Sequence, residues 1–382
     1  MSNKDFLRQM PGADEHLGKG RGLAYRLHID WVLLILLVIL CSVGLGILYS
    51  ASGQSMVHVK AQLTRYGIAF AVMFVFAQIE PETYRRWSPW LFMAGLAALV
   101  SVLLFGTGAK GAQRWLQIPG LPRFQPSEFM KLVVPMMIAW YMSSRFIPPS
   151  IKNVIGALVL VFVPVMLIFK QPDLGTSILI AASGLFVLMF AGISWRLVAG
   201  CAGLVACFAP VMWMFVMRDY QKQRVLTFLD PESDPLGSGW NIIQSKTAIG
   251  SGGPWGKGWL EGTQSQLNFL PESHTDFIIA VLAEEFGFVG VIMLLCLYLM
   301  IVIRGLVIAA DAQSSYARLL GGSLVLTFFV YVFVNIGMVS GILPVVGVPL
   351  PLVSYGGTSA VTLMAAFGVL MSIQTHRKML SR

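Results

Sequence analysis

The polar segment at residues 270–278, LPESHTDFI, holds the side chains of this chain that are best placed for chemistry. It ends a long hydrophilic stretch, and apolar sequence resumes directly after Asp276. A carboxylate at the start of a membrane helix is costly and usually serves function, so Asp276 is our candidate catalytic group. Thr and Asp are also favoured helix caps, and position alone fits a cap at Thr275 or Asp276 equally well.

Two other apolar stretches also begin with ionisable residues. Residues 125–131, QPSEFMK, place Glu128 and Lys131 three positions apart, a spacing that predicts an ion pair on a helix. An ammonium one turn inside a membrane helix needs a partner or a ligand. Residues 171–176, QPDLGT, place Asp173 at a similar start, where helix capping and a role in chemistry are both open.

A short basic connection at about 107–126 carries Lys110, Arg114 and Arg123 together with Trp115. Positive charge retained in one short connection indicates an anion to be bound there. The alternative is that these side chains only meet anionic lipid headgroups.

The elements that must position these residues are membrane helices. The chain has 382 residues, of which 56% are hydrophobic and only 12% charged, and apolar runs long enough to span a bilayer recur along it. We therefore predict an all-α integral membrane protein with about ten transmembrane helices and one long extracytoplasmic loop. The expected spans lie at about 30–50, 62–79, 88–106, 127–144, 152–169, 174–192, 196–216, 277–303, 319–343 and 353–374.

These spans form a single polytopic membrane domain, residues 29–376, with the long loop at 217–276. Polar tails, residues 1–28 and 377–382, flank it. Ten spans put both termini on one side of the membrane, and that side is predicted to be cytoplasmic. Inner segments then hold fifteen Lys and Arg residues against six on the short outer connections, as the positive-inside rule requires. Glu128, Asp173 and Asp276 all fall on the outer face.

Several other classes of site are not indicated. The five His residues are scattered and form no Cys/His cluster at metal-ligand spacing. The glycine-rich run at 250–258, GSGGPWGKG, lacks the spacing of a phosphate-binding loop and is predicted to make tight turns. Membrane topology accounts for the net charge of +9, so nucleic acid is not an expected partner.

Four motifs and the ten-span plan together resemble the SEDS family (shape, elongation, division and sporulation). The motifs are QPSEFMK at 125–131, QPDLGT at 171–176, the segment at 270–277 and PLVSYGG at 351–357. Members of this family, RodA and FtsW, polymerise peptidoglycan from lipid II. Leu174 and residues 341–349, GILPVVGVP, are more similar to RodA, the elongation enzyme.

This resemblance implies a glycosyltransferase of the bacterial inner membrane with its active site on the periplasmic face. Asp276 matches the essential aspartate of the family, and Trp115 matches a tryptophan important for activity. Glu128, Lys131 and Asp173 match other conserved polar positions. The resemblance also implies a complex with a class B penicillin-binding protein, the transpeptidase of the elongation machinery.

The residues suggest how such a reaction proceeds. A sugar 4-hydroxyl displaces polyprenyl pyrophosphate. Because a free aspartate has a pKa near about 3.9, Asp276 is too weak a base to remove the proton in advance and accepts it as the bond forms. Lys131, Arg114 and Arg224 are candidates to balance the charge on the departing pyrophosphate. Trp115 offers an apolar face to a sugar. A divalent cation held by Asp173 or Glu128 is possible, although nothing in the sequence demands one.

Three other functions fit parts of the pattern. A transporter that flips lipid-linked precursors also uses interrupted membrane helices. A non-catalytic scaffold explains a partner but leaves the clustered acids unexplained. Another lipid-linked sugar transferase, such as an O-antigen ligase, shares the chemistry. The unusual charges gather on the predicted outer face, which favours an enzyme over a transporter.

Overall fold

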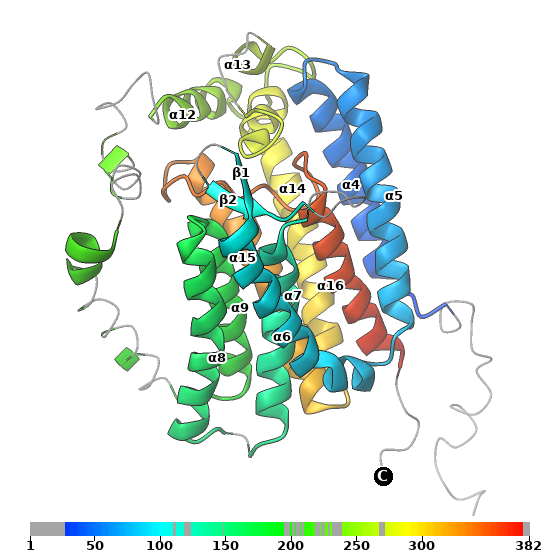
Figure 1. The fold of residues 1–382 in the computed structure, drawn as a ribbon. Coiled ribbons are helices and arrows are strands. Elements are labelled where there is room, and N and C mark those ends of the chain that lie inside the picture. Colours follow the sequence, from blue (N-terminus) through cyan, green and yellow to red (C-terminus); the bar gives the residue numbers. More distant parts are fainter. Residues whose placement is uncertain are drawn as a thin grey trace, which may run out of the picture.

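The computed structural model describes residues 27–109, 112–117, 124–146, 148–194, 239–266 and 272–376, with short pieces between 199 and 230. Its long helices form an elongated bundle (Figure 1). They are α4 (Trp31–Ala51), α5 (Met56–Gln78), α6 (Pro81–Phe105), α7 (Pro126–Ser143), α8 (Ile151–Lys170), α9 (Leu174–Phe190), α14 (Ile278–Ala310), α15 (Ser315–Val339) and α16 (Thr358–Thr375).

The all-α membrane fold is confirmed. Seven of the described helices are long and apolar enough to cross a membrane. Nine of the ten predicted spans coincide with the long helices. The remaining one, at 196–216, lies mostly outside the described residues, which include a π-helix there, Met212–Val216. The count of ten therefore stays a prediction.

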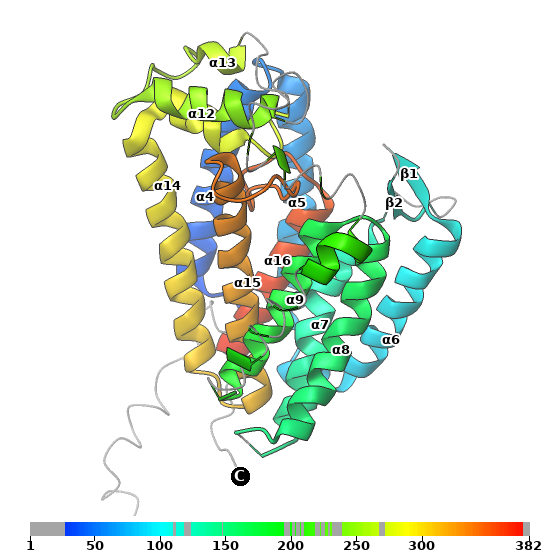
Figure 2. The same ribbon diagram turned by 90° about the vertical axis from the view of Figure 1, so that its left-hand side faces the viewer.

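The connections hold structure that the sequence analysis did not predict. Strands β1 (Thr107–Ala109) and β2 (Ala112–Trp115) pair antiparallel within the basic connection. They are too short for an alternating pattern to be recognised. The long loop contains the helices α12 (Trp240–Gly252) and α13 (Thr263–Gln266). Both lie across one end of the bundle (Figures 1 and 2).

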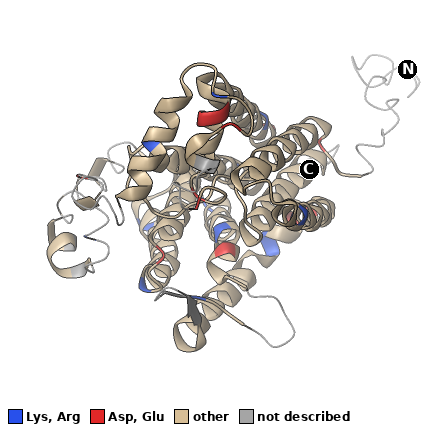
Figure 3. Ribbon diagram, turned by 90° about the horizontal axis from the view of Figure 1, so that it is seen from above, with Lys and Arg blue, Asp and Glu red and all other residues tan. Residues whose placement is uncertain are grey.

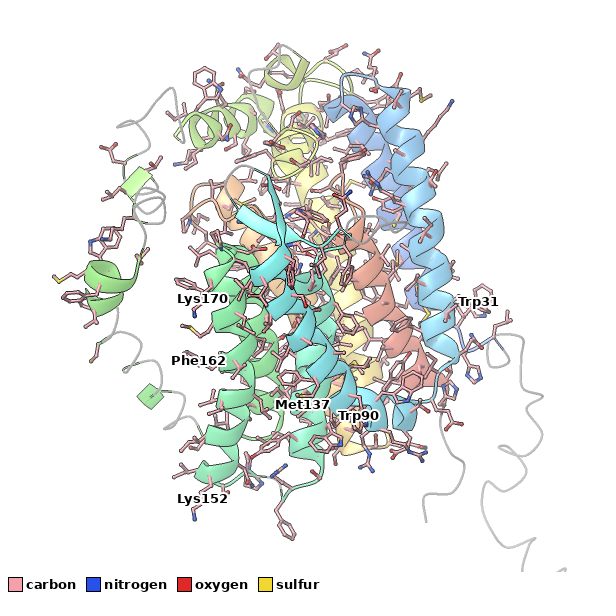
Figure 4. The ribbon with its side chains drawn as sticks, viewed as in Figure 1. Trp31, Trp90, Met137, Lys152, Phe162 and Lys170 are labelled. Atoms are coloured by element: carbon pink, nitrogen blue, oxygen red, sulfur yellow. The ribbon has the colours of Figure 1, made fainter. Side chains whose placement is uncertain are left out.

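The bundle has two groups of helices with α15 between them. In one group α5 packs along α16 and α4 packs on α14, and in the other α6 packs on α7 and α8 on α9. Helix α15 contacts both α14 and α9 (Figure 2). The outer surface is apolar, as expected for contact with lipid. Phe162 points away from the bundle and is 60% exposed, whereas Met137 is buried (Figure 4).

The first and last described residues lie at the same end of the bundle. The ring of His28 stacks on that of His376 with centroids 4.0 Å apart, and its Nδ1 atom lies 3.1 Å from Oγ1 of Thr375. Beside them Asp30 caps α4 and forms an ion pair with Arg304. We call this the proximal end and the opposite end, where α12 and α13 lie, the distal end.

Helix α14 is kinked at Gly287, which has φ 64° and ψ −164°. The amides freed by the kink are satisfied by the glycine-rich run: Phe288 N–H donates to Gly253 O at 2.9 Å and Val289 N–H to Pro254 O at 3.1 Å. The predicted tight turns are confirmed for residues 253–258, where Gly253, Gly256 and Gly258 have positive φ, but the prediction is wrong for residues 250–252, which end helix α12. The first nine residues of α14 are thus a separate helical segment under α12.

We expect Gly287→Ala to lower the unfolding free energy by about 2 kcal/mol or more. A Cβ atom at this position would lie 2.3 Å from the Gly256 amide nitrogen, and its φ/ψ is open only to glycine. Thermal unfolding in detergent measures the effect. Gly67→Ala on α5 is the matched control, since nothing lies within 4 Å of a Cβ there. Equal midpoints for the two variants would show that the kink is not required.

Candidate active site

Asp276 lies at the distal end, in a run of turns directly before α14. The N-cap position of α14 is occupied by Phe277, so the capping interpretation of Thr275 and Asp276 is wrong. The Asp276 side chain is half-buried. Its Oδ2 atom lies 3.6 Å from where a Cβ on Gly347 would be, so the carboxylate adjoins the connection between α15 and α16.

The backbone before α14 is held by that connection and by α15. Tyr355 N–H donates to His274 O at 2.9 Å, and Ser354 Oγ donates to Thr275 O at 2.5 Å. The Nδ2 group of Asn335 donates to Asp276 O at 2.9 Å and to Val348 O at 2.8 Å. Three consecutive carbonyls therefore accept hydrogen bonds from distant residues, and the position of the Asp276 backbone is determined.

Asn335 is a residue that the sequence analysis missed. It is fully buried in α15, and its Oδ1 atom has no hydrogen-bond partner among the described residues. Burying an amide with one unsatisfied atom costs free energy. We infer that Asn335 is present because of the two hydrogen bonds that it donates. The available signal was an Asn inside the apolar run at 319–343, because polar residues within spans are rare and usually functional.

Glu128 and Lys131 form the predicted ion pair. Their side chains are 2.5 Å apart and almost fully buried on the first turns of α7. Lys131 Nζ also lies 4.8 Å from the centroid of the Tyr331 ring, a cation–π contact. The other carboxylate oxygen of Glu128 has no hydrogen-bond partner among the described residues, and both side chains line a small cavity of about 20 Å³.

Asp173 is the N-cap of α9 and also joins three elements. Its Oδ1 atom accepts a bond from Thr176 N–H at 3.3 Å, so the capping alternative is confirmed. Its Oδ2 atom accepts a bond from Gln125 Nε2 at 3.1 Å, at the start of α7. Arg114, on β2, lies 3.9 Å from Oδ1 of Asp173 and donates to Pro172 O. Trp115 follows Arg114 on β2 and is half-buried.

The residues 346–348 connect these groups with Asp276. A Cβ on Gly175 would lie 2.9 Å from Val346 O, so the start of α9 packs closely on residues 346–348, which we call the strip. Val348 packs against Tyr331, whose ring contacts Lys131. The Nδ2 group of Asn335 donates hydrogen bonds to both the Val348 and the Asp276 carbonyls. Seen from the distal end, ribbon positions of both basic and acidic residues lie toward the middle of the bundle (Figure 3).

The structure thus places five predicted site residues, Glu128, Lys131, Asp173, Arg114 and Asp276, around one strip of backbone. Arg224 lies outside the described residues. In the described ranges no three His, Cys, Asp or Glu side chains are grouped as a metal site. Gln125 and Lys131 each bond to one carboxylate oxygen of Asp173 and Glu128, respectively. The divalent cation stays a prediction.

We expect Lys131→Met alone to lower the unfolding free energy by about 3–5 kcal/mol, because it leaves the Glu128 charge buried without its partner. The double variant Glu128→Gln with Lys131→Met is expected to recover most of that loss. Thermal unfolding of the two purified proteins in detergent tests this. If the double variant is no more stable than Lys131→Met, the two side chains are not energetically coupled.

Comparison with known proteins identifies the family. Residues 25–379 match the FTSW_RODA_SPOVE family model, described as "Cell cycle protein". The peptidoglycan glycosyltransferase MrdB of Escherichia coli (strain K12) is 56% identical over 357 residues, 94% of this chain and 96% of that protein. A probable peptidoglycan glycosyltransferase FtsW of Trichlorobacter lovleyi is 37% identical over 368 residues, 92% of this chain and 94% of that protein.

Solved structures agree. A chain from a study of the structural coordination of polymerization and crosslinking by a peptidoglycan synthase complex matches with a TM-score of 0.80 at 29% identity, covering 90% of this chain and 97% of the other. Rod shape determining protein RodA of Thermus thermophilus matches with a TM-score of 0.69 at 26% identity, covering 94% of this chain and 100% of the other. The protein described here therefore belongs to the FtsW/RodA/SpoVE family.

Proposed function

We propose that this protein is a peptidoglycan glycosyltransferase that joins lipid II disaccharides into glycan strands during cell elongation. The observation that carries the proposal is the position of Asp276, half-buried beside Gly347, with its backbone held by Asn335. Relatives named as peptidoglycan glycosyltransferases support the reaction class. Leu174 and residues 341–349, which are more similar to RodA than to FtsW, support a role in elongation.

In the proposed reaction the 4-hydroxyl of one sugar attacks the anomeric carbon of another. The new C–O bond forms as the bond to pyrophosphate breaks, and polyprenyl pyrophosphate leaves with the bonding electrons. Asp276 accepts the hydroxyl proton during this step. Because pyrophosphate is already a good leaving group, no second carboxylic acid is needed to protonate it, in contrast to glycosidases.

Cations near Asp276 balance the charge on the leaving group in this proposal. Arg114 is the most accessible of the described candidates, with its side chain 32% exposed. Lys131 is buried against Glu128, so it does not touch the pyrophosphate. It acts on the leaving group through the electrostatic field of the ion pair. Trp115 offers a ring to a sugar. A divalent cation brought by the pyrophosphate would bind beside Asp173 or Glu128.

The distal end is the periplasmic face in this proposal, and both termini are cytoplasmic in a bacterial inner membrane. The partner is a class B penicillin-binding protein of the elongation machinery, which cross-links the strands. The match to a chain from a peptidoglycan synthase complex supports such a partner.

A lipid transporter is the second candidate, and the distribution of buried charge argues against it. Among the described residues, Asp30 is the buried charged side chain at the proximal end. The other buried charged side chains lie toward the distal end: Glu128, Lys131, Asp173, Glu284 and Glu285. A transport path needs polar groups accessible from both faces, whereas an enzyme at one face does not.

We expect Asp276→Asn to abolish polymer formation from lipid II while the protein stays folded and bound to its partner. The amide keeps the size of the side chain but cannot accept the proton. The assay uses purified protein in detergent, with and without the penicillin-binding protein, where no membrane sidedness exists. Polymer of normal length and yield from this variant would remove Asp276 as the base. Movement of lipid II across liposomes by a wild type that makes no polymer would instead indicate a transporter.

We expect Asn335→Leu to lower kcat by about 10- to 100-fold with KM changed less than about threefold, because a displaced base loses its alignment while bound substrate keeps its contacts. Ser340→Ala, at the C-cap of the same helix, is the control, because its hydroxyl donates to Ile336 O within α15 and to no other described residue. A rise in KM at unchanged kcat would show that Asn335 does not position Asp276.

A further inference from the structure

A second group of side chains lies beside Asp276, on the α5 side. The rings of His58, His274 and Tyr355 have centroids 5.3–5.9 Å apart, and the guanidinium of Arg65 lies 4.2 Å from the centroid of the Tyr355 ring. All four side chains are partly exposed. We call them the Arg65 cluster. His274 belongs to the segment that carries Asp276, so the cluster adjoins the candidate base.

Arg65 is ordered but its charge is not compensated. Within the described part of the chain no carboxylate lies within ion-pair distance of it, whereas Lys131 and Lys257 are paired with Glu128 and Glu284. Its Nη1 atom is 3.4 Å from Oε1 of Gln62, a neutral acceptor. A guanidinium held by a ring, with its charge available, is suited to bind a phosphate or carboxylate group.

The cluster is built on a rigid frame. The buried side chain of Gln62 donates to Gly356 O at 3.2 Å and accepts from Gly356 N–H at 3.3 Å. One turn further along α5, the Tyr66 hydroxyl donates to Leu352 O at 2.7 Å. At Gly357 a Cβ atom would come within 3.4 Å of the Arg65 side chain, so glycine allows Arg65 to lie there. Rigid placement of this kind is typical of binding sites.

The rings complete a surface for a sugar. Burial and the neighbouring His58 ring lower the pKa of His274, against an opposing effect of Glu272, so the ring is neutral at neutral pH. Neutral aromatic faces bind the apolar faces of sugars, while the guanidinium binds anions. An anionic saccharide at the membrane surface matches this combination.

The proposed reaction creates a need for such a site. Each turnover joins two lipid-linked saccharides, and both carry pyrophosphate at the membrane surface. One loses its pyrophosphate, for which Arg114 and Lys131 are the candidates, and the other keeps it while its hydroxyl attacks. A second cation near Asp276 is suited to bind the pyrophosphate that is kept.

We propose that the Arg65 cluster binds the pyrophosphate–saccharide head of the attacking substrate, the molecule that keeps its pyrophosphate. Arg65 contacts the pyrophosphate, and the rings of His58, His274 and Tyr355 contact the saccharide. This inference rests on the proposed function and assigns its second substrate to named side chains.

Counting bound substrate tests the inference without turnover. In full-length protein carrying Asp276→Asn, native mass spectrometry in detergent with lipid II is expected to find two molecules bound. Adding Arg65→Gln is expected to reduce the count to one. Lys60→Gln, an exposed cation on the same helix, is the matched control and should leave two. Two molecules bound with Arg65→Gln would overturn the assignment.

Kinetics of the otherwise wild-type enzyme give a second measurement. Arg65→Gln is expected to raise the half-saturating lipid II concentration at least tenfold, with Arg65→Lys intermediate and Lys60→Gln unchanged. Tyr355→Phe keeps the ring and should behave as wild type, whereas Tyr355→Leu should resemble Arg65→Gln. Matching unfolding temperatures establish that the variants are folded.

Two results separate the inference from the function on which it rests. If wild type polymerises lipid II and Arg65→Gln and Tyr355→Leu both have wild-type saturation curves, the Arg65 cluster is not a substrate site. If wild type makes no polymer, the proposed function falls and the inference with it.

Discussion

The hydrogen bonds to the three carbonyls before α14 are the interaction on which the rest of the distal end depends. They come from Asn335, Ser354 and Tyr355, which belong to α15 and to the connection that follows it. A chain segment without regular structure is tolerated at membrane depth only where it is packed in protein or lines a cavity. Here the same bonds that satisfy the backbone also determine where the Asp276 side chain begins.

That dependence explains why the connection between α15 and α16 is rich in Gly and Pro. Its residues touch Asp276 through Gly347, α9 through Val346 and Val348, and α5 through Leu352 and Gly356. In a regular helix the backbone amides and carbonyls bond to each other from residue i to residue i−4. They would not be available to bond to neighbouring elements. The irregular connection between α15 and α16 can therefore contact helices from both groups of the bundle.

Much of the fold was predictable because the bilayer imposes one length and one polarity on every span. The Glu128–Lys131 pair and the Asp173 cap were predictable for a similar reason, since both depend on spacings of three residues within one helix. Contacts between distant segments were not. Asn335 and Arg65 act on residues 59 and 290 positions away, and no local pattern encodes such a pairing. The β1–β2 hairpin was missed because its strands are only three and four residues long.

The contact between Gln62 and Gly356 joins residues 294 positions apart and has a consequence for biosynthesis. Helix α5 enters the membrane early, with the polar atoms of Gln62 and Tyr66 facing positions that α16 and its preceding loop occupy only much later. Until the ribosome has made those residues, water, lipid headgroups or the insertion machinery must shield that face. A nascent chain released before α16 would therefore expose the polar atoms of Gln62 and Tyr66 without their native partners.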